Sequence, residues 1–288
     1  MRTGLRWTVS LEETLTSPSF ENTFRRAILC ASEQDVAHQR RFRFKQDALA
    51  TLVGRLMARK AAVTQTSRPW SSLEFEQNKN GKPFLIPNEN KDDDDDSDEA
   101  SFNYNVSHHG DLVVLASGDT RIGVDVMRIS EDRHSSVDEQ MNMMKRHFSE
   151  EEVMQVTRNR DEKSRWTAFF RIWCLKESIL KATGVGLPDG LHNHTFRVTE
   201  EVRPDLSTTS TRYFHHQIHQ PQWLFEEAFI GQNHCVAVAS EASTPSSEAL
   251  PFKLITLEEI LKDADFVNVD ADADEELDVF MEKPNKTF

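Results

Sequence analysis

Cysteine is scarce in this 288-residue sequence, and long apolar runs are absent from it. The three cysteines, Cys30, Cys174 and Cys235, are odd in number and far apart, which excludes a disulfide framework and the C-x-x-C spacing of a structural zinc site. No run of about eighteen apolar residues occurs, so no membrane-spanning helix is predicted. The N-terminal residues also lack the apolar core of a signal peptide. We therefore expect a cytosolic protein with reduced thiols and no membrane partner.

The sequence also has no overall basic excess, since its formal net charge is −14. Residues 89–99 carry −7 and residues 258–282 carry −10, which leaves +3 for the rest of the chain. Seven lysines and arginines lie between residues 40 and 60, beside a single aspartate. We expect no nucleic-acid partner, but the charge does not exclude a small anionic ligand. The basic segment fits such a ligand or an ordinary solvated helix face.

The hydrophobic periodicity of the sequence predicts an α+β fold. Strands are expected at 5–11, 121–127, 194–199, 211–218 and 228–239, together with a hairpin over 102–116. Helices are expected over 33–63, in one piece or two, after a capping box at Ser149, and over 163–183.

Composition divides the chain into three parts. Residues 1–118 are predicted to form an N-terminal half with an acidic loop at 88–101, and residues 119–240 a C-terminal half. Residues 241–288 are predicted to be a linker, a docking segment at 252–262 and a disordered acidic tail. This last prediction depends on charge, because like charges repel and bury little apolar surface.

Two acidic residues occupy positions where an acid is unusual. Asp125 lies in the middle of a predicted strand, on the same face as Gly123 and Met127. Glu177 lies on a helical stripe that is expected to face the core. That stripe consists of Trp166, Phe170, Trp173, Glu177 and Lys181. Exposure to solvent would explain both acids; alternatively they converge as two oxygen ligands, a set that suits Mg²⁺.

Five short motifs follow one another along the chain. They are Asn80-Gly81-Lys82-Pro83, Asn105-Val106-Ser107-His108, Gly123-Val124-Asp125-Val126, Phe148-Ser149 and Trp173-x-x-Lys176-Glu177-Ser178-x-x-Lys181. Their form, order and spacing resemble the 4'-phosphopantetheinyl transferases, in particular the two-lobed surfactin-type group and its animal members. The resemblance covers residues 5–240.

This resemblance implies two pseudo-symmetric α+β halves, with a cleft between them that binds coenzyme A and Mg²⁺. It implies transfer of 4'-phosphopantetheine from coenzyme A to a serine of an apo acyl or peptidyl carrier protein domain, with release of adenosine 3',5'-bisphosphate. The carrier domains implied are those of fatty acid synthase and of aminoadipate-semialdehyde dehydrogenase. A monomer is implied as well, because one chain contains both halves.

The resemblance also assigns roles to single residues. Asp125 and Glu177 resemble the metal ligands of the family, and Lys181 resembles its pyrophosphate contact. Either Glu177 or a water on the metal would take the serine proton. Met127 stands where bacterial members carry a third carboxylate, so a third ligand would be water or would come from the turn Ser107–His109. The physics of phosphoryl transfer agrees, because positioning and charge neutralisation supply most of the catalysis.

Contacts to coenzyme A are implied in the N-terminal half. Those matched by motif are Gly81, Lys82, Asn105, Val106, Ser107 and His108, with His108 near the 3'-phosphate. Arg40 and Arg41 are the candidates within the basic segment, unless His38 stands at the position where relatives have an arginine.

Residues 128–148 are the candidate carrier-protein surface. Lys145 and Arg146 would attract an acidic domain, and flexible methionines would tolerate several partners. An ordinary helix with methionines on its core face would give the same pattern. Another Mg²⁺-dependent transferase, or a non-catalytic adaptor that binds carrier proteins, stays possible. The presence of Asp125, Glu177 and Lys181 argues against the adaptor.

Overall fold

The computed structural model describes residues 4–87, 102–129, 135–159, 161–184, 190–199, 207–241 and 249–286. The chain forms two compact units. Unit 1 comprises Met1–Asp119 together with Lys253–Phe288, and unit 2 comprises Thr120–Phe252. Each unit combines helices with β-sheet, which confirms the predicted α+β class. The predicted acidic loop at 88–101 lies outside the described residues.

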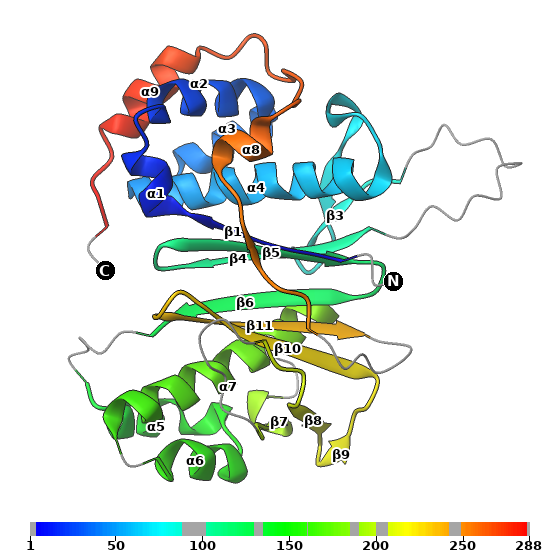
Figure 1. The fold of residues 1–288 in the computed structure, drawn as a ribbon, viewed down its shortest axis with the longest axis vertical. Coiled ribbons are helices and arrows are strands. Elements are labelled where there is room, and N and C mark those ends of the chain that lie inside the picture. Colours follow the sequence, from blue (N-terminus) through cyan, green and yellow to red (C-terminus); the bar gives the residue numbers. More distant parts are fainter. Residues whose placement is uncertain are drawn as a thin grey trace, which may run out of the picture. The chain divides into compact units, whose positions relative to one another are not determined.

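Unit 1 is built on a mixed sheet in the order β12-β1-β5-β4, with helices on one face (Figure 1). The pairs β1–β5 and β5–β4 are antiparallel, whereas β12 runs parallel to β1; β2 and β3 form a separate hairpin. Its elements are β1 (Leu5–Ser10), α1 (Leu11–Thr16), α2 (Phe20–Cys30), α3 (Glu33–Arg40), α4 (Lys45–Thr66), the 3-10 turn η1 (Trp70–Ser72), β2 (Phe75–Gln77), β3 (Pro83–Leu85), β4 (Asn103–His109), β5 (Leu112–Gly118), β12 (Lys253–Leu254), α8 (Leu257–Leu261) and α9 (Ala273–Met281).

The basic segment of the sequence forms two helices, α3 and α4. The Ser32 side chain caps α3, and α4 packs its apolar face on the sheet. Gly54 permits close approach, because a Cβ there would lie 3.0 Å from Val106 Cγ1. Arg59 is buried rather than solvated, and its guanidinium donates to the carbonyl oxygens of Trp70 and Leu73, each at 3.0 Å. The segment is therefore only partly a solvated face.

The C-terminal segment corrects the prediction of a disordered tail. From Lys253 onward the chain belongs to unit 1, where β12 pairs with β1 and both α8 and α9 pack against α2 and α4 (Figure 1). Leu277 and Phe280 of α9 are buried, and the Phe280 ring lies 4.6 Å from the Phe24 ring. The prediction was wrong because the high acidic content concealed apolar residues at helical spacing.

Unit 2 contains a three-stranded sheet in the order β10-β11-β6 and a second small sheet, β7-β8-β9. All neighbouring strands in both sheets are antiparallel. Its elements are β6 (Ile122–Arg128), α5 (Val137–Met144), the 3-10 turn η2 (Lys145–His147), α6 (Glu150–Thr157), α7 (Glu162–Thr183), the 3-10 turn η3 (Leu191–Asn193), β7 (His194–Arg197), β8 (Arg212–His215), β9 (Ile218–His219), β10 (Trp223–Ile230) and β11 (His234–Glu241).

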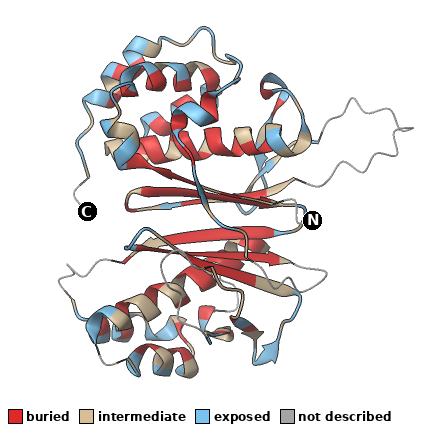
Figure 2. Cartoon of the chain, in the orientation of Figure 1, coloured by how far each residue is buried: buried red, intermediate tan, exposed pale blue. Residues whose placement is uncertain are grey.

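The helix α7 packs along β6 and β11 and forms the centre of unit 2. Gly123 of β6 makes this possible, since a Cβ there would overlap the backbone atoms Ser178 O and Ala182 N. Buried residues fill the strands and the helix faces that meet them (Figure 2). The single strand predicted at 228–239 is wrong, because a turn at Gly231, with φ of 61°, divides that run between β10 and β11.

The three cysteines are buried free thiols. Cys174 Sγ of α7 lies 3.6 Å from Cys235 Sγ of β11. Burial raises the pKa of the Cys30 and Cys174 thiols, which keeps them protonated and poorly reactive. Within the described ranges, no helix has both the length and the apolar character that crossing a membrane requires.

Candidate active site

Asp125 and Lys181 meet where β6 packs against α7. Lys181 Nζ donates to Asp125 Oδ1 at 2.7 Å, and the Asp125 side chain is only 8% exposed. Asp125 faces α7 because it shares a strand face with Gly123, over which the helix backbone passes. The mid-strand position that looked unusual in the sequence therefore places a carboxylate against a helix and not against solvent.

Glu177 lies one helical turn before Lys181 and is half-buried. Burial raises the pKa of Glu177, and the negative charge of Asp125 raises it further, whereas Lys181 lowers it. Lys181 thus pairs with Asp125, and Glu177 stands one turn before Lys181 on the same helix, where the charge of Asp125 acts on it. Two interacting acids with one lysine form a site that gains from an added cation.

The donor set fits Mg²⁺ in its chemistry. Carboxylate oxygens are the ligands that this ion prefers, and it commonly takes only one or two from the protein, with water and substrate phosphates completing its shell. Among the residues that the structure describes, no group of three or more His, Cys, Asp or Glu side chains is arranged to hold a metal. Met127 shares the strand face of Asp125 and supplies no hard oxygen donor.

The predicted aromatic stripe of α7 is only partly buried. Trp166 and Phe170 are in the core, but Trp173, Glu177 and Lys181 are half-buried. The helix is instead buried over much of its circumference, including Ile172, Leu175, Lys176, Ser178 and Ile179. The stripe therefore passes from the core toward the surface along α7. Glu177 lies in its C-terminal part and is partly exposed to solvent.

Sequence reasoning missed an ion pair beside the candidate site. Lys176 and Glu152 are fully buried, and Lys176 Nζ lies 2.8 Å from Glu152 Oε2. Lys176 also donates to the carbonyl oxygens of Leu191, at 2.9 Å, and of His194. Glu152 accepts from the backbone N–H groups of Ser149 and Phe196. The pair joins α7, α6 and β7, so it fixes the helix turn that carries Glu177.

The coenzyme A candidates of the N-terminal half lie in unit 1. Gly81, with φ of 80°, forms the turn between β2 and β3, where Asn78 Oδ1 accepts from the backbone N–H groups of Asn80 and Lys82. The turn presents the half-buried Lys82 beside an exposed glycine. β3 in turn packs against β4.

The second motif of unit 1 occupies β4, paired with β5. Asn105 and Ser107 share one face of this strand and are buried, whereas Val106 and His108 share the other. Val106 contacts α4 at Gly54, and His108 is exposed at the end of the strand. The four residues matched by motif therefore divide between the two faces of one strand.

The two candidate arginines of the basic segment, Arg40 and Arg41, differ in their surroundings. Arg40 is held by carboxylates of α9, with Nε 2.7 Å from Glu276 Oε1 and Nη2 3.1 Å from Glu275 Oε1. Arg41 is exposed at the end of α3. Burial lowers the pKa of the nearby His38, as do the charges of Arg55 and Arg41, so His38 is a weak cation. Arg41 is the better placed of the two arginines for an anion.

Comparison with known proteins places both units in one family. A family profile described as 4'-phosphopantetheinyl transferase, N-terminal, matches residues 17–120, and the profile of the 4'-phosphopantetheinyl transferase superfamily matches residues 121–239. The two matches meet beside the boundary between unit 1 and unit 2 at Asp119.

Curated relatives agree with these profiles. The chain is 34% identical over 239 residues to the L-aminoadipate-semialdehyde dehydrogenase-phosphopantetheinyl transferase of Rattus norvegicus, which covers 82% of this chain and 74% of the relative. The human protein of the same name is 32% identical with the same coverage. The 4'-phosphopantetheinyl transferase psf-1 of Bacillus pumilus is 32% identical over 168 residues, or 58% of this chain and 63% of the relative.

These matches confirm the resemblance seen in the motifs, and they extend it across both units. The chain belongs to the 4'-phosphopantetheinyl transferase superfamily and is a transferase of that family.

Proposed function

We propose that this protein transfers the 4'-phosphopantetheine arm of coenzyme A to a serine of apo acyl or peptidyl carrier protein domains. The serine oxygen forms a bond to the phosphorus that bears pantetheine, and the bond from that phosphorus to the bridging oxygen breaks. Adenosine 3',5'-bisphosphate leaves, and the serine proton passes to a base. The observation that carries the proposal is the convergence of Asp125, Glu177 and Lys181 in a chain of this family.

Asp125 and Glu177 are the residues that would hold Mg²⁺. When bound, the ion neutralises charge on the pyrophosphate of the substrate. Lys181 adds a donor from the same helix face, one turn beyond Glu177. Because burial and the charge of Asp125 both raise the pKa of Glu177, its carboxylate is also a candidate base for the serine proton. The buried ion pair of Lys176 and Glu152 fixes α7, the helix that carries Glu177 and Lys181.

Coenzyme A would contact unit 1 through the turn at Gly81 and Lys82 and through β4. The Lys82 ammonium and the His108 ring supply cationic or hydrogen-bonding groups for phosphate oxygens, and Asn105 and Ser107 supply polar side chains. We further propose that the protein is cytosolic and monomeric. Its carrier domains would be of the fatty acid synthase and aminoadipate-semialdehyde dehydrogenase types.

The reaction is tested by the intact mass of a purified apo carrier domain after incubation with the protein, coenzyme A and Mg²⁺. We expect a gain of one phosphopantetheine group and the formation of adenosine 3',5'-bisphosphate. A protein that bound carrier domains yet changed no mass, with or without Mg²⁺, would support the adaptor in place of the enzyme. Release of a different nucleotide product would support another Mg²⁺-dependent transferase.

The role of Glu177 is tested by Glu177→Gln. Glutamine keeps the size of the side chain but removes its charge and basicity, so we expect the transfer rate to fall at least about 100-fold. The matched control is Glu13→Gln, which removes an exposed carboxylate of α1 and is expected to be neutral. If Glu177→Gln modified the carrier as fast as the wild type, the transferase would stand and this role for Glu177 would not.

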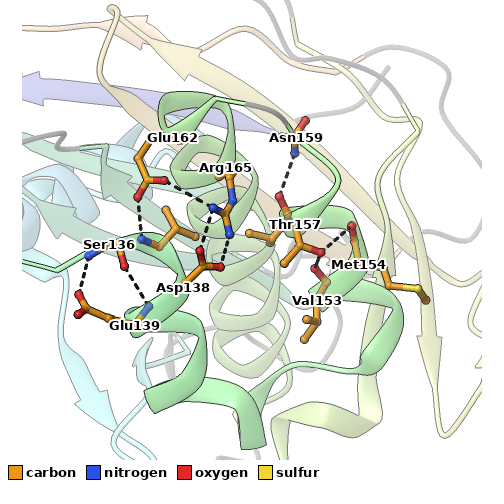
Figure 3. A network of polar contacts seen from close by, with 11 residues as sticks. Ser136, Asp138, Glu139, Val153, Met154, Thr157, Asn159, Glu162 and Arg165 are labelled. Carbon is orange, nitrogen blue, oxygen red and sulfur yellow. Dashed lines mark hydrogen bonds and ion pairs between the residues drawn. The ribbon is translucent and has the colours of Figure 1, made fainter.

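The candidate carrier-protein surface is anchored by polar contacts between α5 and α7 (Figure 3). Ser136 and Glu139 form a capping box at the start of α5, and Asp138 forms an ion pair with Arg165 of α7. Glu162 accepts from the Val137 N–H at 2.8 Å. The network fixes the start of α5 on α7, whereas residues 130–134 of the predicted surface lie outside the described residues.

Beyond this network the surface is mixed, because exposed cations and methionines stand beside Glu150 and Glu151, and Glu151 pairs with Arg197 at 2.8 Å. Lys145 and Arg146 are exposed on η2 and line a groove of 910 Å³ together with Met154, His192 and Arg197. Met143 and Met154 are 66% and 61% exposed, whereas Met141 is in the core. Met141 thus agrees with an ordinary core face, and we propose that the exposed part receives an acidic carrier domain.

Charge reversal at Lys145 and Arg146 tests this surface. We expect the double substitution to glutamate to raise KM for the carrier domain about tenfold at low salt, with KM for coenzyme A unchanged. The matched control reverses two other exposed cations of unit 2, Arg158 and Lys163. An unchanged carrier KM in the first variant, or an equal rise in the control, would contradict the assignment.

A further inference from the structure

Residues 283–286 lie against the loop that joins α3 to α4. Lys283 Nζ donates to the carbonyl oxygens of Arg40, at 3.0 Å, and of Phe42, at 2.8 Å. The Lys45 N–H donates to Pro284 O at 3.0 Å. We call residues 273–286 the C-terminal strap. Its end thus binds backbone groups on both sides of Arg43.

Side chains extend the same attachment in both directions. Lys286 Nζ lies 2.8 Å from Asp47 Oδ1, in the first turn of α4. At the other end, Glu275 and Glu276 of α9 hold the Arg40 guanidinium. Glu276 is 6% exposed and also accepts from Gln39 Nε2 at 3.3 Å. The strap therefore contacts the chain from the last turn of α3 to the first turn of α4.

These contacts satisfy groups that a helix leaves open. The last carbonyl oxygens of a helix have no partner within the helix, and a lysine ammonium is a suitable donor for them. Here the donor for α3 comes from Lys283, 243 residues later in the chain. The strap itself is anchored by the buried side chains of Leu277 and Phe280, away from the loop. The loop therefore takes its backbone conformation from a separately anchored segment.

The attachment divides the arginines of the loop into two kinds. Arg40 is neutralised by the strap, whereas Arg41 and Arg43 are exposed on a backbone that the strap fixes. We propose that the C-terminal strap positions Arg41 and Arg43 to bind phosphate groups of coenzyme A, with Lys283 as the positioning residue. This inference depends on the proposed function for its ligand, but the contacts that carry it lie wholly within unit 1.

The experiment measures binding of coenzyme A and of adenosine 3',5'-bisphosphate to the full chain by calorimetry, without a carrier domain. Lys283→Met removes the donor and frees the loop, so we expect the dissociation constant for both nucleotides to rise about fivefold. Lys283→Arg keeps a donor and should restore most of the affinity. Arg121→Ala is the control, because it breaks an exposed ion pair of 2.7 Å with Glu241 in unit 2 without touching the strap or the loop.

A double-mutant cycle separates positioning from a general loss of structure. If Lys283 acts through the arginines, Lys283→Met should weaken binding little in an Arg41→Ala/Arg43→Ala background. In kinetic assays KM for coenzyme A should rise while kcat is kept. If Lys283→Met has a much lower melting temperature than the wild type, Lys286→Met replaces it in the experiment. Lys286→Met loosens the same loop at Asp47, and we expect the same loss of nucleotide affinity.

The outcomes are distinct. Wild-type affinity in Lys283→Met, or equal losses in the Arg121→Ala control, would overturn the strap proposal and leave the proposed function intact. A fivefold loss that persists undiminished without Arg41 and Arg43 would overturn it as well. A wild-type protein that bound neither nucleotide would overturn the proposed function, and this proposal with it.

Discussion

Replacing Lys176 by methionine is expected to lower the free energy of unfolding by about 3–5 kcal/mol, because it leaves a buried carboxylate without its counter-ion. Glu152 is fully buried in unit 2, and the Lys176 ammonium is its only cationic partner among the described ion pairs. The substitution also removes the donor for the carbonyl oxygens of Leu191 and His194. Methionine fills a similar volume, so loss of packing contributes little to the effect.

The pH dependence of the Lys176→Met variant gives a second readout. Burial raises the pKa of Glu152 already in the wild type, where the charge of Lys176 opposes the shift. Without Lys176 the folded-state pKa of Glu152 rises further, while the unfolded carboxyl keeps its ordinary pKa of about 4.3. A raised folded pKa favours the protonated folded state. The variant should therefore be most stable below the unfolded pKa and should lose stability as the pH rises toward the folded one.

Urea unfolding of the wild type, the single variant and Lys176→Met/Glu152→Gln measures these effects. The double variant should recover part of the loss, because a neutral amide is less costly to bury than an unpaired carboxylate. Lys163→Met, at an exposed site of the same helix, controls for the change of side chain. A Lys176→Met variant as stable as the wild type at pH 7 would show that the pair contributes nothing to the fold.

The ion pair of Lys176 and Glu152 also shows which part of α7 could not be predicted from the sequence. The mid-strand place of Asp125 and the place of Glu177 one turn before Lys181 could be predicted, because strand and helix periods are regular. The buried face of α7 could not, because aromatic spacing indicated a stripe through Trp173 and Glu177, while the core also takes in Lys176 and Leu175. A helix buried over much of its circumference carries little periodic signal, and a lysine is seldom expected inside.

In the acid-rich C-terminal segment, the sequence predicted disorder where the structure has a helix with buried side chains. Net charge predicted disorder beyond the docking segment at 252–262, although Leu277 and Phe280 are spaced for one helix face. What charge could not indicate is the partner surface, since Arg25 and Arg40 lie more than two hundred residues earlier in the chain. By contrast, the β4–β5 hairpin was predictable because its alternation and its turn are local.

Deleting the chain after Phe252 should therefore leave unit 1 unable to fold. The deletion removes an edge strand and six buried apolar side chains, from Ile255, Leu257, Ile260, Leu261, Leu277 and Phe280. At about 1.5–3 kcal/mol each, their burial is worth on the order of 10 kcal/mol before the entropy of ordering the segment is subtracted. That is comparable to the whole stability of a typical domain, and Phe24 would lose its packing partner as well.

The two units can be followed separately, because Trp7 and Trp70 lie in unit 1 and the other tryptophans in unit 2. Full-length Phe280→Ala should by itself lower stability by about 3–5 kcal/mol, since it opens a cavity beside Phe20 and Phe24. The matched variant Asp278→Asn removes one charge of α9, keeps its apolar face and should change stability by less than about 0.5 kcal/mol. If the deletion left the unit 1 tryptophans in a native environment, or if Asp278→Asn cost as much as Phe280→Ala, the apolar anchor would not be what holds this segment.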